Sequence, residues 1–392
     1  MAEQQSVTGD LDDRVRLTFT SADGKQNVAP IIESYEFTKS ILTQPAAYSL
    51  RLGWGNVTKD LLSVLKPQLP TQIVINDCIQ ATGFLDDVEA SGEVGATEIS
   101  LHGRDALARM HDSYIEAELS LTDSTYAQLV ERALSETVGD YVLSYSNEQN
   151  RRLTTGIGVK QTGAPDVDPT QNSKGPIAKQ LKAHIGERWY EYVKRQLDRA
   201  GLFLWCDGNG EFTLTAPNAN QAPIYRIERR RGQTRDQVNV ISARFRNATS
   251  QRFSECKIYG RGGGKKFGRT KVSGIFVDQE MTALGLKRPL VIHDANVTNE
   301  EQAVFYARRK IAESIRASWN LTYTVAGHTI PSLQNGQRAV WAPDTVVSVS
   351  DDEFGLSDNY YIEKVTFRRN PATTTELTLL RRDSLVFATG EF

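Results

Sequence analysis

The chain has 392 residues, of which 39% are hydrophobic and 24% charged, and its formal net charge is −2. Because a domain usually holds about 100–200 residues, this length predicts two to four domains. The small net charge provides no global attraction to nucleic acid or to a membrane surface. Residues 1–13 lack the apolar core of a secretory signal, and no apolar run approaches the ~18 residues of a membrane span.

The sequence carries no signature of a metal, cofactor or catalytic site. Cys78, Cys206 and Cys256 are far apart, which predicts free thiols in a reducing compartment and no disulfide framework or zinc site. The five histidines include no pair at the four-residue spacing of a helical metal site. Gly-x-Ser-x-Gly is absent, so a nucleophile elbow is not predicted.

Residues 12–107 have the pattern of an all-β unit. Val15, Leu17 and Phe19 alternate with polar residues, and a second alternating run extends from Tyr48 to Trp54. Several short strands at this spacing favour a small barrel or sandwich.

Residues 108–217 have a mixed pattern. An apolar stripe at helical spacing runs from Tyr126 to Val138, with Asp123 or Ser124 as the expected N-cap and Gly139 as the stop. Residues 150–178 are rich in Gly, Pro, Thr, Asn and Gln and predict a long loop. A second helix is predicted at about Glu187–Ala200, followed by a hairpin around Asp207–Gly210.

The β pattern returns after residue 222 and is then interrupted. Strands are predicted at Ile224–Ile227, Val238–Phe245 and Cys256–Tyr259, and the pattern resumes at Leu321. Between them, alanines and isoleucines every four residues predict a helix at about Asn299–Ala317. We therefore interpret residues 261–318 as an insertion into a second β-unit.

Two segments of the β-units resemble each other. Thr97–Leu107 matches Thr375–Leu385 at an offset of 278, with six of eleven positions identical. Upstream, Leu85–Val88 corresponds to Ile362–Val365, shifted by one residue in the intervening turn. Each segment is typical of the last hairpin of a β-unit, which suggests a scaffold that arose by duplication.

The sequence contains two adjacent carboxylate pairs, Asp86-Asp87 and Asp351-Asp352. Neighbouring residues on a strand point to opposite faces, so neither pair is expected to converge on one substrate bond. We interpret both pairs as solvated hairpin residues.

The glycine-rich loop Gly260–Arg269 does not fit a phosphate site. Lys266 stands where a Walker A loop needs Ser or Thr, and the third glycine of a dinucleotide-binding fingerprint is missing. The loop could contact an acidic partner or a nucleic acid, or serve as a solvated connector.

Arg-Asp dipeptides recur in both matching segments, at Arg104-Asp105 and Arg382-Asp383. They could fix equivalent contacts between neighbouring β-units, or form local ion pairs worth about 0–1 kcal/mol. The candidate interface residues are Arg104, Asp105, Arg382, Asp383, Arg261, Lys265, Lys266 and Arg269.

Taken in order, these features identify a family resemblance. The chain resembles the baseplate hub proteins of contractile-tailed phages, of the Mu-like or late-control-D type, and their relatives in contractile injection systems. The stretches that carry the resemblance are Gly83–Val88, Ile99–Asp105, Arg199–Trp205, Tyr259–Gly264, Val325–His328 and Tyr361–Val365.

The resemblance implies a mainly β fold with α+β accessory parts: two tube-protein-like β-barrels plus two smaller domains. The expected domains are a first barrel at residues 1–110, an α+β domain with a long loop at 111–221, a second barrel at 222–260 and 319–392, and an inserted domain at 261–318.

The resemblance also implies a structural role without enzymatic activity or cofactor. Three chains would form a ring whose six barrels match one layer of the tail tube, joining it to the central spike. The expected partners are the homotrimer, the spike, the tube protein and other baseplate proteins, with DNA only in transit through the lumen and no membrane. The expected location is the virion tail baseplate, assembled in the host cytoplasm.

Three alternatives remain open from the sequence. The first is the hub of an injection system or tailocin without a genome. The second is a peptidoglycan hydrolase at the tail tip, although no segment here resembles a lysozyme or peptidase. The third is a carbohydrate-binding β-protein of the tail tip.

Overall fold

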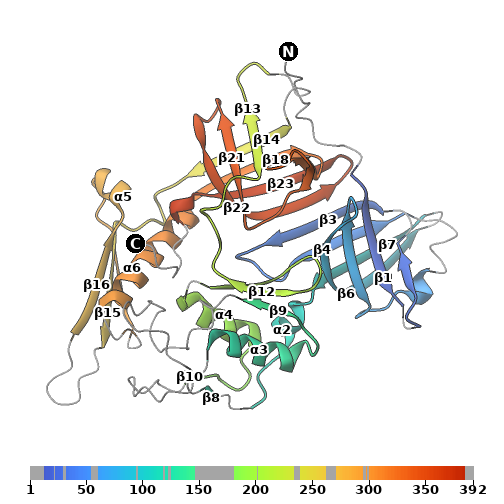
Figure 1. The fold of residues 1–392 in the computed structure, drawn as a ribbon, viewed down its shortest axis with the longest axis horizontal. Coiled ribbons are helices and arrows are strands. Elements are labelled where there is room, and N and C mark those ends of the chain that lie inside the picture. The colour runs from blue at the N-terminus through green and yellow to red at the C-terminus, as the bar shows by residue number, and fades with distance from the viewer. Residues whose placement is uncertain are drawn as a thin grey trace.

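The fold is mainly β, as the sequence predicts (Figure 1). The computed structural model describes residues 13–21, 23–29, 32–53, 61–93, 96–117, 120–121, 125–145, 181–200, 202–233, 239–261, 271–294, 297 and 300–384. The predicted loop at 150–178 therefore lies outside the described residues.

One continuous sheet of thirteen strands dominates the structure, in the order β14-β18-β23-β22-β3-β4-β7-β6-β5-β1-β2, with β21 and β13 branching from β22. Its first half contains β1 (Val15–Thr20), β2 (Gln26–Val28), β3 (Ile32–Ser40), β4 (Ala47–Leu52), β5 (Pro70–Ile75), β6 (Cys78–Glu93) and β7 (Ala96–Asp105). Its second half contains β13 (Tyr225–Arg229), β14 (Val240–Asn247), β18 (Trp319–Ala326), β21 (Thr345–Asp351), β22 (Leu356–Arg369) and β23 (Thr373–Leu380).

The two halves share one topology. In the first unit the strands are ordered β3-β4-β7-β6-β5-β1, and in the second β14-β18-β23-β22-β21-β13. When β2, which has no counterpart in the second unit, is left out and the other strands are numbered along the chain, the same numbers occupy the same positions in both units. One difference is polarity: β1 is antiparallel to β5, whereas β13 is parallel to β21. An arrangement this specific supports duplication more strongly than the short sequence match does.

A single hydrophobic core lies under both units, because the strands alternate buried and exposed residues. In β18, for example, every second residue from Trp319 to Val325 is buried. The largest side chains with almost no exposure include Trp341, Tyr323 and Phe367. Burial of each such side chain contributes roughly 1.5–3 kcal/mol. The short strands β19 (Thr329–Pro331) and β20 (Arg338–Val340) lie beside this core.

A helical domain with its own core follows the first unit (Figure 1). It contains α2 (Ala108–Asp112), α3 (Tyr126–Thr137), α4 (Trp189–Ala200), the sheet β11 (Phe203–Cys206)–β12 (Phe212–Thr215)–β9 (Leu143–Tyr145), and the pair β8 (Ser120–Leu121) and β10 (Leu181–Lys182).

The predicted start of α3 was wrong by one or two residues. Its N-cap is Thr125, which forms a capping box with Gln128, and not Asp123 or Ser124. All three residue types cap helices well, so the sequence alone could not choose between them. The predicted end is confirmed, since the helix stops at Thr137 and Gly139 has a positive φ of 90°.

A small α/β domain interrupts the second unit. It consists of the sheet β16 (Lys271–Val277)–β15 (Glu255–Arg261)–β17 (Pro289–His293), with α5 (Gln279–Ala283) and α6 (Glu300–Ser318). In Figure 1, α6 lies against this sheet. The contact is close: a Cβ on Gly274 of β16 would lie 2.3 Å from the backbone nitrogen of Val304 in α6.

The strand at Cys256–Tyr259 was predicted to belong to the second β-unit, and this assignment was wrong. Among the described strands, β15 pairs only with β16 and β17, and its buried residues Cys256 and Ile258 pack against α6. Its alternating pattern is the same whether a sheet or a helix covers the apolar face, so periodicity could not reveal its partner.

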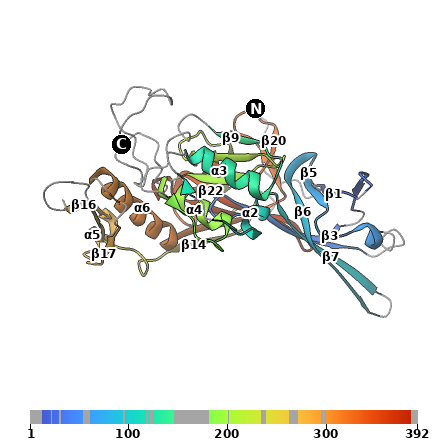
Figure 2. The same ribbon diagram turned by 90° about the horizontal axis from the view of Figure 1, so that it is seen from below.

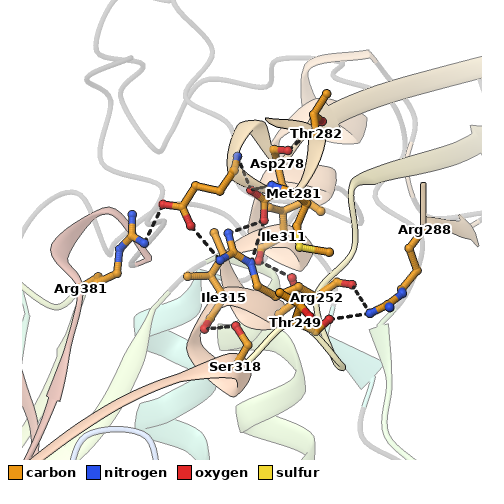
Figure 3. A network of polar contacts seen from close by, with 12 residues as sticks. Thr249, Arg252, Asp278, Met281, Thr282, Arg288, Ile311, Ile315, Ser318 and Arg381 are labelled. Atoms are coloured by element: carbon orange, nitrogen blue, oxygen red, sulfur yellow. Dashed lines mark hydrogen bonds and ion pairs between the residues drawn. The ribbon is translucent and has the colours of Figure 1, made fainter. Parts of the chain in front are cut away.

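A buried ion pair anchors the small domain (Figure 3). Arg252 donates to Asp278 at 2.6 and 3.0 Å and to Glu280 at 2.7 Å. Glu280 also pairs with Arg381, which follows the last strand of the main sheet, at 2.7 Å. The Arg252 and Asp278 side chains are each only 3% exposed. These contacts join the small domain to the end of β23.

A polar cluster joins the two units inside the main core. The Tyr35 hydroxyl lies 2.7 Å from Nε2 of His328, and the Thr375 hydroxyl lies 2.9 Å from its Nδ1. Asp13 accepts hydrogen bonds from the His328 backbone and, at 3.2 Å, from the Thr329 hydroxyl. Burial lowers the pKa of His328 to about 3, so its ring is neutral at neutral pH.

We expect Arg252→Gln to lower the free energy of unfolding by about 3–5 kcal/mol, because it leaves Asp278 buried without its charged partner. Urea denaturation of the full chain measures this. Arg230→Gln is the matched control, since the Arg230 side chain is 57% exposed and its surface pair contributes little. Equal, small losses in both variants would contradict the anchoring role.

The buried His328 predicts acid sensitivity with a definite sign. Unfolded chain takes up a proton at this residue near pH 6.5, whereas the folded chain does so only near 3. Stability is therefore lost as the pH falls below 6.5, by up to about 1.4 kcal/mol per pH unit. Burial raises the pKa of Asp105 to about 7, so this residue has the opposite effect on the pH dependence: its contribution to stability increases as the pH falls.

Comparison of the wild type with His328→Gln isolates the effect of His328, because Asp105 is present in both proteins and its contribution cancels in the difference between their free energies of unfolding. The difference in free energy of unfolding between wild type and variant should shrink from pH 7 to pH 5 in urea titrations. A difference that stays constant over this range would show that His328 does not stay neutral in the folded chain.

Candidate assembly interface

The two β-units meet in a direct strand-to-strand joint. β3 pairs antiparallel with β22, from Tyr35 opposite Arg369 to Ser40 opposite Lys364. On the core side, the Phe37 and Phe367 rings stack with centroids 5.8 Å apart, and Phe37 is 2% exposed. We call this pairing the internal joint.

Charges across the internal joint are paired. On the opposite side of the sheet, Arg368 of β22 bonds Glu36 of β3 and Glu376 of β23, each at 2.9 Å. Thr38 and Thr366 face each other with their hydroxyl oxygens 3.0 Å apart. Cross-strand pairs of this kind each contribute roughly 0.2–1 kcal/mol, in addition to the backbone hydrogen bonds.

Matching β-bulges align the two units residue by residue. Along the β6–β7 hairpin the register shifts at Asp86, and along the β22–β23 hairpin it shifts at Glu363. Along β3 and β14 the shifts fall at Glu33 and Ile241. Bulges are local kinks with a fixed place in a fold, so we use them to equate β6 with β22 and β3 with β14.

This alignment corrects the sequence match by two residues. Val88 pairs with Leu101 in the first hairpin, and Val365 pairs with Leu377 in the second. Leu101 thus corresponds to Leu377, whereas the sequence match equated it with Leu379. A strand shifted by two residues keeps its apolar face, so hydrophobic pattern alone does not detect the error.

The bulge at Asp86 also changes the interpretation of the acidic pairs. Asp86 bonds Arg104 at 2.6 and 3.0 Å, and Asp87 pairs with His102 on the same side of the sheet, so the two carboxylates do not point to opposite faces. Asp87 is exposed, as expected, whereas Asp351 is not solvated: it is 1% exposed and accepts a hydrogen bond from Tyr323 at 2.7 Å.

The predicted interface residues of the first hairpin are engaged within the chain. Arg104, at the end of β7, bonds Asp86 and Asp112. Asp105 is buried and accepts from the backbone nitrogens of Ala46 and Leu107 at 2.9 and 3.0 Å. Burial raises the Asp105 pKa and lowers that of the nearby Lys39.

The second Arg-Asp pair has a different setting. Arg382 lies in the 3₁₀ helix η1 (Arg382–Ser384) and donates to the Ala219 carbonyl at 2.6 Å. Asp383 is in the same turn. Of the basic loop, Arg261 ends β15, and Lys265, Lys266 and Arg269 lie outside the described residues.

Among the open strand edges of the main sheet, two are the counterparts of the strands in the internal joint. Within the described residues, β14 pairs only with β18, and residues 87–92 of β6 pair only with β7. The β6–β7 hairpin projects away from the body of the molecule (Figure 2). Phe245 on β14 is 37% exposed, in contrast to its buried counterpart Phe37. These edges have no local signal in the sequence, because edge position depends on topology.

The described residues include no cluster of three or more His, Cys, Asp or Glu side chains suited to a metal ion. None of the described helices combines the length and apolar character needed to cross a membrane.

Comparison with known proteins gives matches among solved structures. Scanned against family models, the chain matches none, and no curated protein matches its sequence. A tail protein of prophage MuSo2 from Shewanella oneidensis has a TM-score of 0.70 and 22% identity over 95% of this chain and 100% of that one.

Two further structures have the same fold. The tail protein from Neisseria meningitidis MC58 has a TM-score of 0.71 and 19% identity over 95% of this chain and 98% of that one. The c3393 protein of E. coli is described as a type VI secretion component similar to T4 tail proteins gp27 and gp5. It has a TM-score of 0.53 and 12% identity over 93% of this chain and 76% of that one. The chain therefore has the fold of these phage tail proteins and of this type VI secretion component, which confirms the predicted resemblance.

Proposed function

We propose that this protein is the structural baseplate hub of a contractile phage tail. Three copies form a ring of six β-units, which joins the tail tube on one face to the central spike on the other. The observation that carries this proposal is the internal joint, because it shows how one β-unit attaches to the next by continuing a sheet. Such a joint repeated around a ring covers the edges of β14 and of the outer half of β6, which are open in the single chain.

Each chain has two units of the same strand order, so a trimer presents six similar units to a sixfold tube. When each copy contacts the next through two different surfaces, the copies form a closed ring if the rotation from one copy to the next is a whole fraction of a full turn. Permanent interfaces of this kind commonly bury about 2,000–5,000 Å². The solved phage tail structures with this fold support a location in the virion tail. We place the protein at the baseplate of that tail, assembled in the host cytoplasm, as part of this proposal.

The polar side of the sheet suits a lumen through which DNA passes. Besides the pairs around Arg368, Arg51 on this side pairs with Glu98 at 3.1 Å. At these positions the arginines are occupied by carboxylates, which weakens their attraction for the phosphate groups of passing DNA. We infer that this side lines the lumen.

The role proposed is binding without turnover. The neighbours named as tail proteins support a structural component. In this proposal any cell-wall hydrolysis belongs to a partner. The hub of a secretion particle or tailocin is the second candidate, favoured by the similarity to a type VI secretion component. Imaging of the native particle, with or without a packaged genome, separates the two.

Sedimentation of the purified chain, alone and with its spike, tests the proposed ring. We expect a species of three times the 43.7 kDa chain mass. The proposal fails if the chain is monomeric in both samples and also in disassembled particles.

A further inference from the structure

We infer that β14 of one copy pairs antiparallel with residues 87–92 of β6 in the next copy, so that the sheet continues between chains. The partner is a second copy of this chain. This inference rests on the proposed function, because it requires the second unit of one chain to meet the first unit of its neighbour.

The internal joint supplies the template. It pairs the outer half of β22 with β3, and their counterparts by strand order are the outer half of β6 and β14. Both counterparts lack a second strand partner in the described part of the chain. The same two kinds of strand edge are thus paired with each other once within the chain, in the internal joint, and are left unpaired once, at β14 and at the outer half of β6.

The bulges fix the register of the new pairing. The pairing in the internal joint begins directly after the bulge at Glu363, so the pairing of β6 begins after Asp86. The bulges at Glu33 and Ile241 align β3 with β14 in the same way. Transfer of the observed pairs sets Glu89 opposite Arg246, Ala90 opposite Phe245 and Ser91 opposite Arg244.

Charge and polarity agree with this register. β14 carries Arg244 and Arg246, and β6 carries Asp87 and Glu89, all of them exposed. Within the described residues none of these four forms an ion pair, whereas Arg368 in the internal joint forms two. In the inferred register the Glu89 carboxylate faces the Arg246 guanidinium, and opposite charges in this position stabilise a strand pair.

The apolar side also matches. Phe245 would meet Ala90 on the core side, at the position where Phe37 meets Phe367 in the internal joint. A shift of one residue would turn Arg246 toward the core side and Phe245 toward the polar side. The inferred register is therefore the one that keeps both sides consistent with the internal joint.

Disulfide trapping tests the register. The Ile41 nitrogen donates to the Glu363 carbonyl at 3.1 Å, so alternation makes Glu36–Arg368 a non-hydrogen-bonded pair, as its counterpart Ser91–Arg244 would be. Cα atoms in such pairs lie about 4.5 Å apart, within the range of a disulfide. Ser91→Cys with Arg244→Cys should give covalent trimers upon mild oxidation.

The background is Cys78→Ser, which removes the exposed native thiol. The matched control combines Ser91→Cys with Phe245→Cys, one residue off and on the other side of the sheet. It should give little cross-linked product. Cross-linking of the control at the same yield as the test pair would overturn the inferred register.

Charge reversal tests the same contact without a new bond. Glu89→Arg or Arg246→Glu alone should weaken trimer association by about tenfold or more, because like charges then face each other. The double variant should restore association. Arg132→Glu on α3, whose side chain is 56% exposed, is the control and should leave association unchanged.

The outcomes separate the inference from the proposed function. A trimer in which the register-matched cysteines stay reduced, or in which the double variant gives no rescue, overturns the inferred pairing and leaves the ring intact. Failure of the parent chain to form a trimer, alone, with its spike or in particles, overturns both.

Discussion

The structure depends on one interaction, the antiparallel pairing of β3 with β22. Without it the two units would be separate sheets, each with open edges, and the shared core under Phe37 and Phe367 would be divided. Backbone hydrogen bonds give the joint its direction, and Arg368 with its two glutamates fixes its register. A duplicated unit that joins itself in this way contains a template for joining the next copy.

Buried polar groups stabilise the joints at the borders of the units. Ser40 at the end of β3 donates to the buried Glu363 at the bulge of β22. His328 and its partners connect the first unit to the second, and Arg252 holds the small domain. Because a buried polar group is costly unless it is paired, each of these contacts disfavours any other arrangement.

The sequence predicted features that depend on local pattern. Alternation located strands such as Val15–Thr20, and four-residue spacing located α6 almost to its ends. It could not predict features that depend on partners. The repeat was found but misaligned by two residues, since only the bulges at Asp86 and Glu363 define the register. For the same reason β15 was assigned to the wrong sheet, and the open edges gave no local signal.

Electron cryomicroscopy of the hub within an assembled particle is the most direct test of the account. We expect six β-units in one continuous ring, with β14 of each chain hydrogen-bonded to β6 of the next, as β22 is bonded to β3 within the chain. A ring in which the chains meet through their helical domains, with β14 and the outer half of β6 left open, would contradict it.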